Sequence, residues 1–185
     1  EASLRELLRQ AAEIRLQRKG QELAARAREV GWNQALQEAL FAALGCETVL
    51  SAHTGSDTVA RGESLVTAEF CAPMFAALGH ADELLGSDVD FVFVPHHIRE
   101  ACPEGFTNAY FCCYVQAYPS LVRSALQERA RDRLLAPVVD FSDTSNLAGG
   151  LAEALRGPLG VTRRQVLAAV EAGRAAQDRF RRENL

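Results

Sequence analysis

Cysteine is the residue type in this chain that offers the most reactive chemistry. The chain contains five cysteines, at positions 46, 71, 102, 112 and 113. An odd number of cysteines with no secretory signal ahead of them is atypical of a disulfide framework, and a chain of 185 residues does not need one. We therefore expect free thiols in a reducing compartment, the cytoplasm. Each would be either a buried small side chain or a metal ligand or redox group.

The first candidate site surrounds Cys71. Pro73 suits the first turn of a helix, so the spacing predicts that Cys71 lies at a helix N-terminus, just after a strand. Free backbone N–H groups and the positive end of the helix dipole stabilise a thiolate there, the form that ligates metals or attacks electrophiles. The alternative is a thiol packed at the end of the strand, and the local sequence leaves both open.

The second candidate is the adjacent pair Cys112 and Cys113, beside a predicted strand over residues 113–117. Neighbouring side chains of a strand point to opposite faces, so one thiol would face a site and the other the core. Cys102 lies in a loop with proline and glycine, and we expect Cys46 in the core. The sequence contains no CxxC or HxxxH pair, the spacings that are typical of zinc ligands. Separated cysteines on loops fit an iron–sulfur cluster better, since thiolate is its usual ligand.

Histidine and aspartate offer weaker candidates. His96 and His97 directly follow the strongest predicted strand, where they could ligate a metal or move protons or be ordinary polar loop residues. His80 falls within a predicted helix and His53 on a predicted loop. Asp140 ends another strand and serves either a site or the backbone of its own loop. The absence of GxGxxG, GxxxxGK[ST] and GxSxG removes the main support for dinucleotide, P-loop and nucleophile-elbow sites.

The elements that must position these residues alternate between helices and short apolar strands. We predict strands over residues 47–51, 64–68, 89–94, 113–117 and 135–141, and helices over 3–27, 32–44, 73–85 and 119–131, with two further helices after residue 143. Apolar strands separated by helices indicate a parallel sheet covered on both faces. The prediction is a doubly wound α/β fold with a mainly parallel sheet of four to five strands.

The chain is expected to form one domain, excised from a longer protein because it begins at Glu1 without an initiator methionine. Residues 1–45 would form an N-terminal helical segment, residues 46–145 the α/β core, and residues 146–185 the C-terminal helices that pack on it. We predict that Gly157 and Pro158 end the first of these helices and that Thr162 and Gln165 form a capping box for the last. The arginine-rich face of that last helix is predicted to be solvated surface.

Composition excludes several classes of partner. With 48% hydrophobic and 24% charged residues, the chain is not a disordered one. No stretch reaches the roughly 20 consecutive apolar residues of a membrane helix. A net charge of −4 offers no overall surface for a polyanion, so neither nucleic acid nor a membrane is an expected partner.

Four segments, in order, resemble the activase-related proteins that belong with the 2-hydroxyacyl-CoA dehydratases, of which 2-hydroxyglutaryl-CoA dehydratase is the best-known member. The segments are EFCAP with GHADELL (69–73 and 79–85), DVDFVFVP (88–95), YFCCYVQ (110–116) and LLAPVVDF (134–141). The last three are similar to the family's VDFIFLP, CPYVQ and LLSPVLDF. Their order and spacing agree from about Gly45 to Phe180, which is most of the chain.

The resemblance implies a Rossmann-like domain that holds or shares a [4Fe–4S] cluster. In that family an ATP-dependent activase donates one low-potential electron to a cluster-bearing dehydratase. Carried over by position, Cys71 and Cys112 are the best ligand candidates, and Cys102 is the only reasonable addition. Cys113 stands where the family has proline, so which cysteine of the pair would bind iron is open. The remaining ligands would come from another domain, a dehydratase or activase partner, or an acyl-CoA substrate.

Two further hypotheses compete with the cluster-binding domain. The first is a non-catalytic docking or regulatory module that has lost the cluster, which the replaced proline and a degraded form of the family's GIPRAL segment over residues 30–36 favour. The second is a small-molecule-binding α/β domain unrelated to iron, which rests only on analogy of fold. In either case the domain alone is not expected to be an active enzyme.

Overall fold

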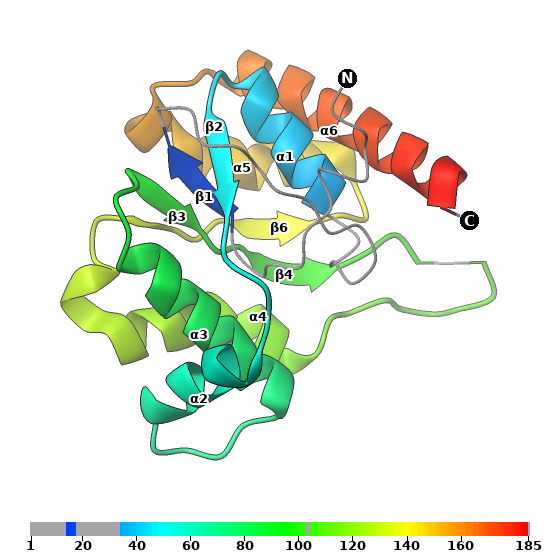
Figure 1. The fold of residues 1–185 in the computed structure, drawn as a ribbon. Coiled ribbons are helices and arrows are strands. Elements are labelled where there is room, and N and C mark those ends of the chain that lie inside the picture. Colours follow the sequence, from blue (N-terminus) through cyan, green and yellow to red (C-terminus); the bar gives the residue numbers. More distant parts are fainter. Residues whose placement is uncertain (1–13, 18–33, 103, 185) are drawn as a thin grey trace.

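The computed structural model describes residues 14–17, 34–102 and 104–184 (Figure 1). In chain order, its elements are β1 (Ile14–Gln17), α1 (Gln34–Ala43), β2 (Glu47–Leu50), α2 (Ser56–Ser64), α3 (Ala72–Leu85), β3 (Phe91–Phe93), β4 (His96–Arg99), α4 (Cys113–Leu126), the 3₁₀ helix η2 (Gln127–Arg129), β5 (Leu134–Leu135), β6 (Val138–Asp140), α5 (Thr144–Leu159) and α6 (Arg163–Asn184). The predicted α/β class is confirmed. None of the helices in these residues is both long enough and apolar enough to cross a membrane.

The strands form two small sheets rather than the predicted single, mainly parallel one. The larger sheet has the order β2–β1–β3–β5, in which β1 is antiparallel to both of its neighbours and only β3 and β5 are parallel. A separate parallel pair consists of β4 and β6. The prediction of a mainly parallel sheet is wrong because β1 inserts between β2 and β3.

Residues 14–17 account for that difference. We predicted them as part of a helix over residues 3–27, on apolar spacing of three to four residues. Ile14 and Leu16 also alternate with Arg15 and Gln17, which is the two-residue period of a strand, and pairing on both sides selects the strand. The rest of that predicted helix lies outside the described residues, as does the Val30–Asn33 part of the GIPRAL-like segment.

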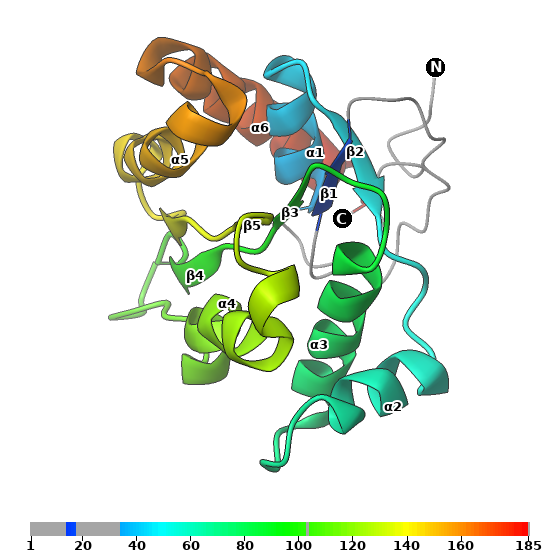
Figure 2. The same ribbon diagram turned by 90° about the vertical axis from the view of Figure 1, so that its left-hand side faces the viewer.

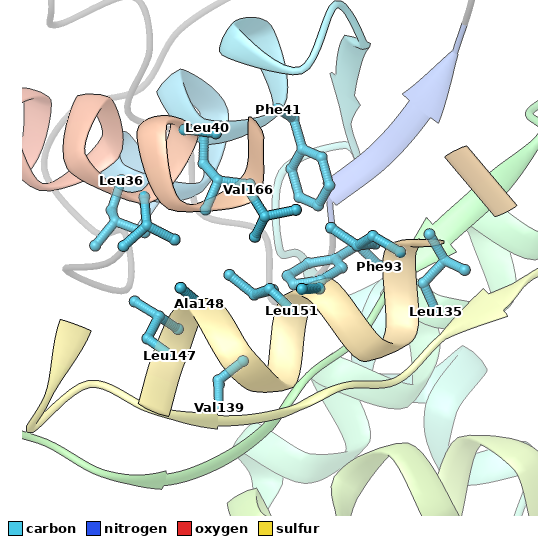
Figure 3. Packing of buried hydrophobic residues seen from close by; sticks show 14 of the residues in the cluster. Leu36, Leu40, Phe41, Phe93, Leu135, Val139, Leu147, Ala148, Leu151 and Val166 are labelled. Carbon is cyan, nitrogen blue, oxygen red and sulfur yellow. The ribbon is translucent and has the colours of Figure 1, made fainter. Parts of the chain in front are cut away.

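Helices cover both faces of the larger sheet, as predicted (Figure 2). Side chains that alternate along β3 divide the interior into two cores. Phe93 points into the first core, with α1, α5 and α6, where its ring meets that of Phe41 edge-on at 4.7 Å between centroids (Figure 3). Val92 and Val94 point into the second core, with α3 and α4. The sheet therefore fixes the positions of two separate helical layers.

The strand predicted over residues 64–68 is wrong. Ser64 ends α2, and the backbone N–H of Leu65 caps this helix by donating to the carbonyl groups of Gly62 and Glu63. Leu65 and Val66 then pack, half-buried, against the second core. Two apolar residues are too few to distinguish a strand from a packed turn, so neighbouring structure decides.

The strand predicted over residues 113–117 is also wrong, with consequences for the candidate site. These residues form the start of α4, whose buried residues Tyr118, Val122 and Leu126 recur every four positions. This is the helical period, and packing against α3 overrides the β-propensity of the segment. The predicted helix over 119–131 is confirmed in part, since α4 continues to Leu126 and η2 follows.

The remaining strands and the C-terminal helices agree more closely with prediction. The predicted strand over 135–141 is divided into β5 and β6, and β4, which was not predicted, pairs with β6. Asp143 caps α5 by accepting from the N–H of Asn146 at 2.8 Å. This helix passes through Pro158 and ends at Leu159, with Gly160 as its C-cap in the left-handed conformation at φ 65°, so the predicted end at Gly157 and Pro158 is wrong. The capping box of Thr162 and Gln165 is confirmed.

Candidate cysteine site at two helix N-termini

Two helices of the second layer, α3 and α4, each begin directly after a cysteine. Cys71 is the N-cap residue of α3, with Pro73 in the first turn as predicted, and its carbonyl accepts from the N–H of Met74 at 2.8 Å. Cys112 is the N-cap residue of α4, and its carbonyl accepts from the N–H of Gln116 at 3.1 Å. Both cysteines are exposed. Each helix therefore presents its free N–H groups beside an accessible thiol.

Contacts between α3 and α4 place these two N-termini side by side. The ring of Phe70, just before Cys71, meets the ring of Tyr114 edge-on at 5.5 Å between centroids. Further along, the buried hydroxyl of Tyr118 donates to the carbonyl oxygen of Ala77 at 2.5 Å. Ala77 and Tyr118 each lie six residues beyond the cysteine that precedes their helix. The two helices therefore run in the same direction with both cysteines at the same end.

This end of the helices corresponds to a known position for ligands in α/β folds. Helix α3 leads into β3, and α4 leads through η2 into β5, and these two strands are parallel neighbours. Each helix returns to the start of its strand, so its own N-terminus lies toward the carboxyl edge of the sheet. Open α/β sheets bind their ligands at this edge. Both Cys71 and Cys112, the N-cap residues of α3 and α4, therefore lie toward this edge.

The start of α4 alters the chemistry of the Cys112 thiol. The backbone N–H of Tyr114, with smaller contributions from the N–H of Val115 and the thiol of Cys113, lowers its pKa below the ordinary value, against a partial desolvation that raises it. Cys113 is the first residue of α4 and is exposed as well. The prediction that one of the pair faces the core is therefore wrong, because the pair begins a helix.

The other cysteines have different surroundings. Cys102 lies on an arm, residues 100–102 and 104–109, that projects beyond β4 (Figure 1), and its Sγ lies 3.1 Å from the carbonyl oxygen of Phe106. Cys46 is half-buried and packs against the first core, close to our prediction. No three His, Cys, Asp or Glu side chains within the described residues come together as a metal-binding group. Cys102 is therefore not brought into a three-ligand set with Cys71 and Cys112.

The histidines that follow β3 are packed residues of β4. His96 donates from Nδ1 to the carbonyl oxygen of Gln116 at 2.7 Å. His97 lies between two phenylalanine rings, stacked on Phe141 at 5.4 Å and edge-on to Phe111 at 5.5 Å. Burial, and secondarily the positive charge of a protonated His96, lower the pKa of His97 to about 4. His97 is therefore neutral at pH 7 and contributes to packing.

Asp140 accepts hydrogen bonds from its own loop and forms an ion pair with Arg99, which was not predicted from the sequence. Its carboxylate accepts from the backbone N–H of Ser142 at 2.9 Å and from Nε of Arg99 at 2.8 Å. Burial opposes ionisation, but the hydrogen bonds from Ser142 and Arg99 outweigh it and lower the pKa of Asp140. Arg99 and Asp140 are register partners in the parallel pair β4–β6, so only the pairing of these strands could have indicated the ion pair.

His80 anchors the loop that follows β2. Only 2% of this residue is exposed, and its Nε2 lies 2.9 Å from Oγ1 of Thr54. Burial lowers its pKa, against an opposing effect of the carboxylate of Glu83. In the same region, Oε1 of Glu83 accepts from the backbone N–H of Ala52 at 3.0 Å. These contacts make His80 a structural residue of the loop between β2 and α2.

The fold and the site together define an α/β domain that presents two accessible thiols at the carboxyl edge of a small mixed sheet. Comparison with protein families then gives the relationship: residues 30–185 match the family described as the CoA enzyme activase uncharacterised domain, and the chain belongs to this family. Searches of curated proteins and of solved structures found no significant match.

Cys112 is expected to be the exposed cysteine that alkylates fastest with iodoacetamide at neutral pH. The thiolate is the nucleophile in this reaction. Each unit by which the pKa of the thiol falls raises the alkylation rate about threefold, because the thiolate fraction rises more than the nucleophilicity of the thiolate declines. Mass spectrometry of peptides over a time course measures this. Cys112→Ser should remove the fastest site, whereas Cys102→Ser, the matched exposed control on the arm, should not. Equal rates at Cys102 and Cys112 would contradict the prediction.

Proposed function

We propose that this domain supplies Cys71 and Cys112 as two ligands of an iron–sulfur cluster that serves low-potential electron transfer in acyl-CoA chemistry. The observation that carries the proposal is the pair of exposed thiols at the neighbouring N-termini of α3 and α4. Membership of a CoA enzyme activase family supports a CoA-dependent enzyme system as the setting. The thiols of Cys71, Cys102, Cys112 and Cys113 are exposed, which supports a reducing compartment such as the cytoplasm as part of the proposal.

Thiols are the right type of ligand for an iron–sulfur cluster, but two thiols are fewer than a [4Fe–4S] cluster needs. Cluster iron is held by thiolates, and the N–H groups at the start of α4 favour the thiolate of Cys112. When bound, a cluster supplies one-electron transfer. A [4Fe–4S] cluster takes about four ligands. The others would come from another domain of the parent chain, a dehydratase or activase partner, or an acyl-CoA substrate, with Cys113, the neighbour of Cys112, as a further candidate in this chain.

Anaerobic iron and acid-labile sulfide analysis of the full-length protein tests the proposal. We expect iron and sulfide together with broad visible absorbance, and we expect Cys71→Ala with Cys112→Ala to abolish all three signals. The matched control is Cys46→Ala, which removes a half-buried thiol that packs against the first core. Circular dichroism checks that each variant is folded. A cluster that persists in the folded double variant, or that depends equally on Cys46, would refute the assignment.

A second function remains in competition, namely a docking or regulatory module that binds no cluster. The observation that favours it is that the described residues contain no three-ligand metal group. In that case the full-length protein, reconstituted with iron and sulfide under reducing anaerobic conditions, would bind no iron. It would still associate with its CoA-enzyme partner, which co-purification of the two proteins would detect. Cluster formation on Cys71 and Cys112 would exclude this reading.

A further inference from the structure

A solvent-open hollow is lined by residues near the N-termini of α5 and α6. These two helices lie on the side of the sheet opposite to α3 and α4 (Figure 2). Its volume is about 330 Å³. Ser145 and Ala148 line it from α5, and Arg163, Arg164 and Leu167 line it from α6. This volume is within the range of small-molecule sites, which begins at about 300 Å³. The lining thus combines two cations, one hydroxyl and two apolar side chains, with no carboxylate.

The two arginines are not used by the fold. Within the described part of the chain, neither guanidinium group has a hydrogen-bond or ion-pair partner, although other arginines on the surface do. Both occupy the first turn of α6, which contains no acidic residue. Cations at a helix N-terminus oppose the helix dipole. Asp143, which caps the neighbouring helix α5, accepts from the N–H of Asn146. Folding alone therefore does not explain two adjacent arginines here.

We propose that this hollow binds a phosphate monoester carried on a small organic molecule. The planar guanidinium groups of Arg163 and Arg164 match the oxygen atoms of a phosphate, to which arginine donates paired hydrogen bonds, and the hydroxyl of Ser145 can donate one more. Leu167, which is 40% exposed, offers an apolar contact for the organic part. A bound dianion would also reverse the unfavourable charge at the start of α6. The site is independent of the cysteines.

Isothermal titration of the full chain with phenyl phosphate tests the proposal, with phenol and inorganic phosphate as partial ligands. We expect phenyl phosphate to bind more tightly than inorganic phosphate, and phenol not to bind. Replacing both arginines, Arg163→Gln with Arg164→Gln, should weaken the binding of phenyl phosphate at least tenfold. Leu167→Gln should weaken phenyl phosphate but leave inorganic phosphate unchanged, which separates recognition of the organic part from recognition of the phosphate.

The matched control removes the same charge elsewhere on α6, through Arg179→Gln with Arg182→Gln, two exposed positions outside the hollow. This variant should bind phenyl phosphate like the wild type. Equal weakening in both double variants would mean a non-specific effect of charge and would overturn the proposal. The proposal would also be overturned if phenyl phosphate did not bind, or if an acidic peptide bound at Arg163 and Arg164 and phenyl phosphate did not.

Discussion

Replacing Gly79 by alanine will lower the free energy of unfolding by about 3 kcal/mol or more, and will release α2 from α3. A Cβ atom at Gly79 would lie 2.0 Å from the carbonyl oxygen of Thr58 in α2. The reciprocal position, Gly62 of α2, would place its Cβ 1.8 Å from the carbonyl oxygen of Phe75 in α3. Both obstacles are backbone atoms within helices, so a side-chain rotation cannot relieve either clash.

The size of the effect follows from how α2 is attached. Gly62 is the only buried residue of α2, so this helix is held by backbone contact rather than by large apolar side chains. Denaturant unfolding measures the stability of Gly79→Ala, and amide hydrogen exchange in α2 reports its release. Gly149→Ala in α5 is the matched control, because its Cβ would meet nothing within 4 Å and should add about 0.5–1 kcal/mol. Equal stability of Gly79→Ala and wild type would show that the helices do not cross this closely.

Acidification from about pH 6.5 to pH 4 will destabilise the domain, with His97 contributing about 3 kcal/mol at most. Burial lowers the pKa of His97 to about 4 in the folded state, while the unfolded residue titrates near 6.5. Between these values the unfolded chain binds the additional proton, so stability rises with pH and is lost as pH falls. His80, whose pKa is also lowered by burial, acts in the same direction. The carboxylate of Asp140 loses its contribution only at still lower pH.

The variant His97→Phe isolates this contribution. It keeps an aromatic ring between Phe111 and Phe141 but cannot bind a proton. Its free energy of unfolding, measured by urea titration at several pH values, should fall less steeply with acidification than that of the wild type. His80→Gln should remove the smaller share that belongs to His80. Parallel curves for wild type and His97→Phe would mean that His97 is accessible to protons in the folded protein.

The parts of the fold that sequence reasoning predicted correctly depend on contacts between near neighbours in the chain. Cys71 and Pro73 indicated the start of α3, and Thr162 with Gln165 indicated the start of α6. A cap hydrogen bond joins residues about three positions apart, so its residue types appear together in the sequence. The four family segments likewise indicate the family that the comparison confirms.

The parts that were wrong depend on partners distant in the chain. Residues 14–17 fit either period, and the choice of a strand depends on β2 and β3. Residues 113–117 favour a strand by propensity, yet burial of Tyr118 against α3 makes them a helix, which exposes both Cys112 and Cys113. Propensities differ by less than about 1 kcal/mol per residue, so the burial of a few apolar side chains overrides them.

The same distinction applies to the site. The sequence by itself determined which residues could serve: cysteines at the starts of helices, in the order of a known family, without a zinc or nucleotide motif. Only the tertiary structure decided that α3 and α4 run in parallel, so that Cys71 and Cys112 lie at the same end. It likewise decided that Arg99 pairs with Asp140 and that Arg163 and Arg164 line one hollow. These are contacts between elements, and they form only when several elements bury their apolar faces together.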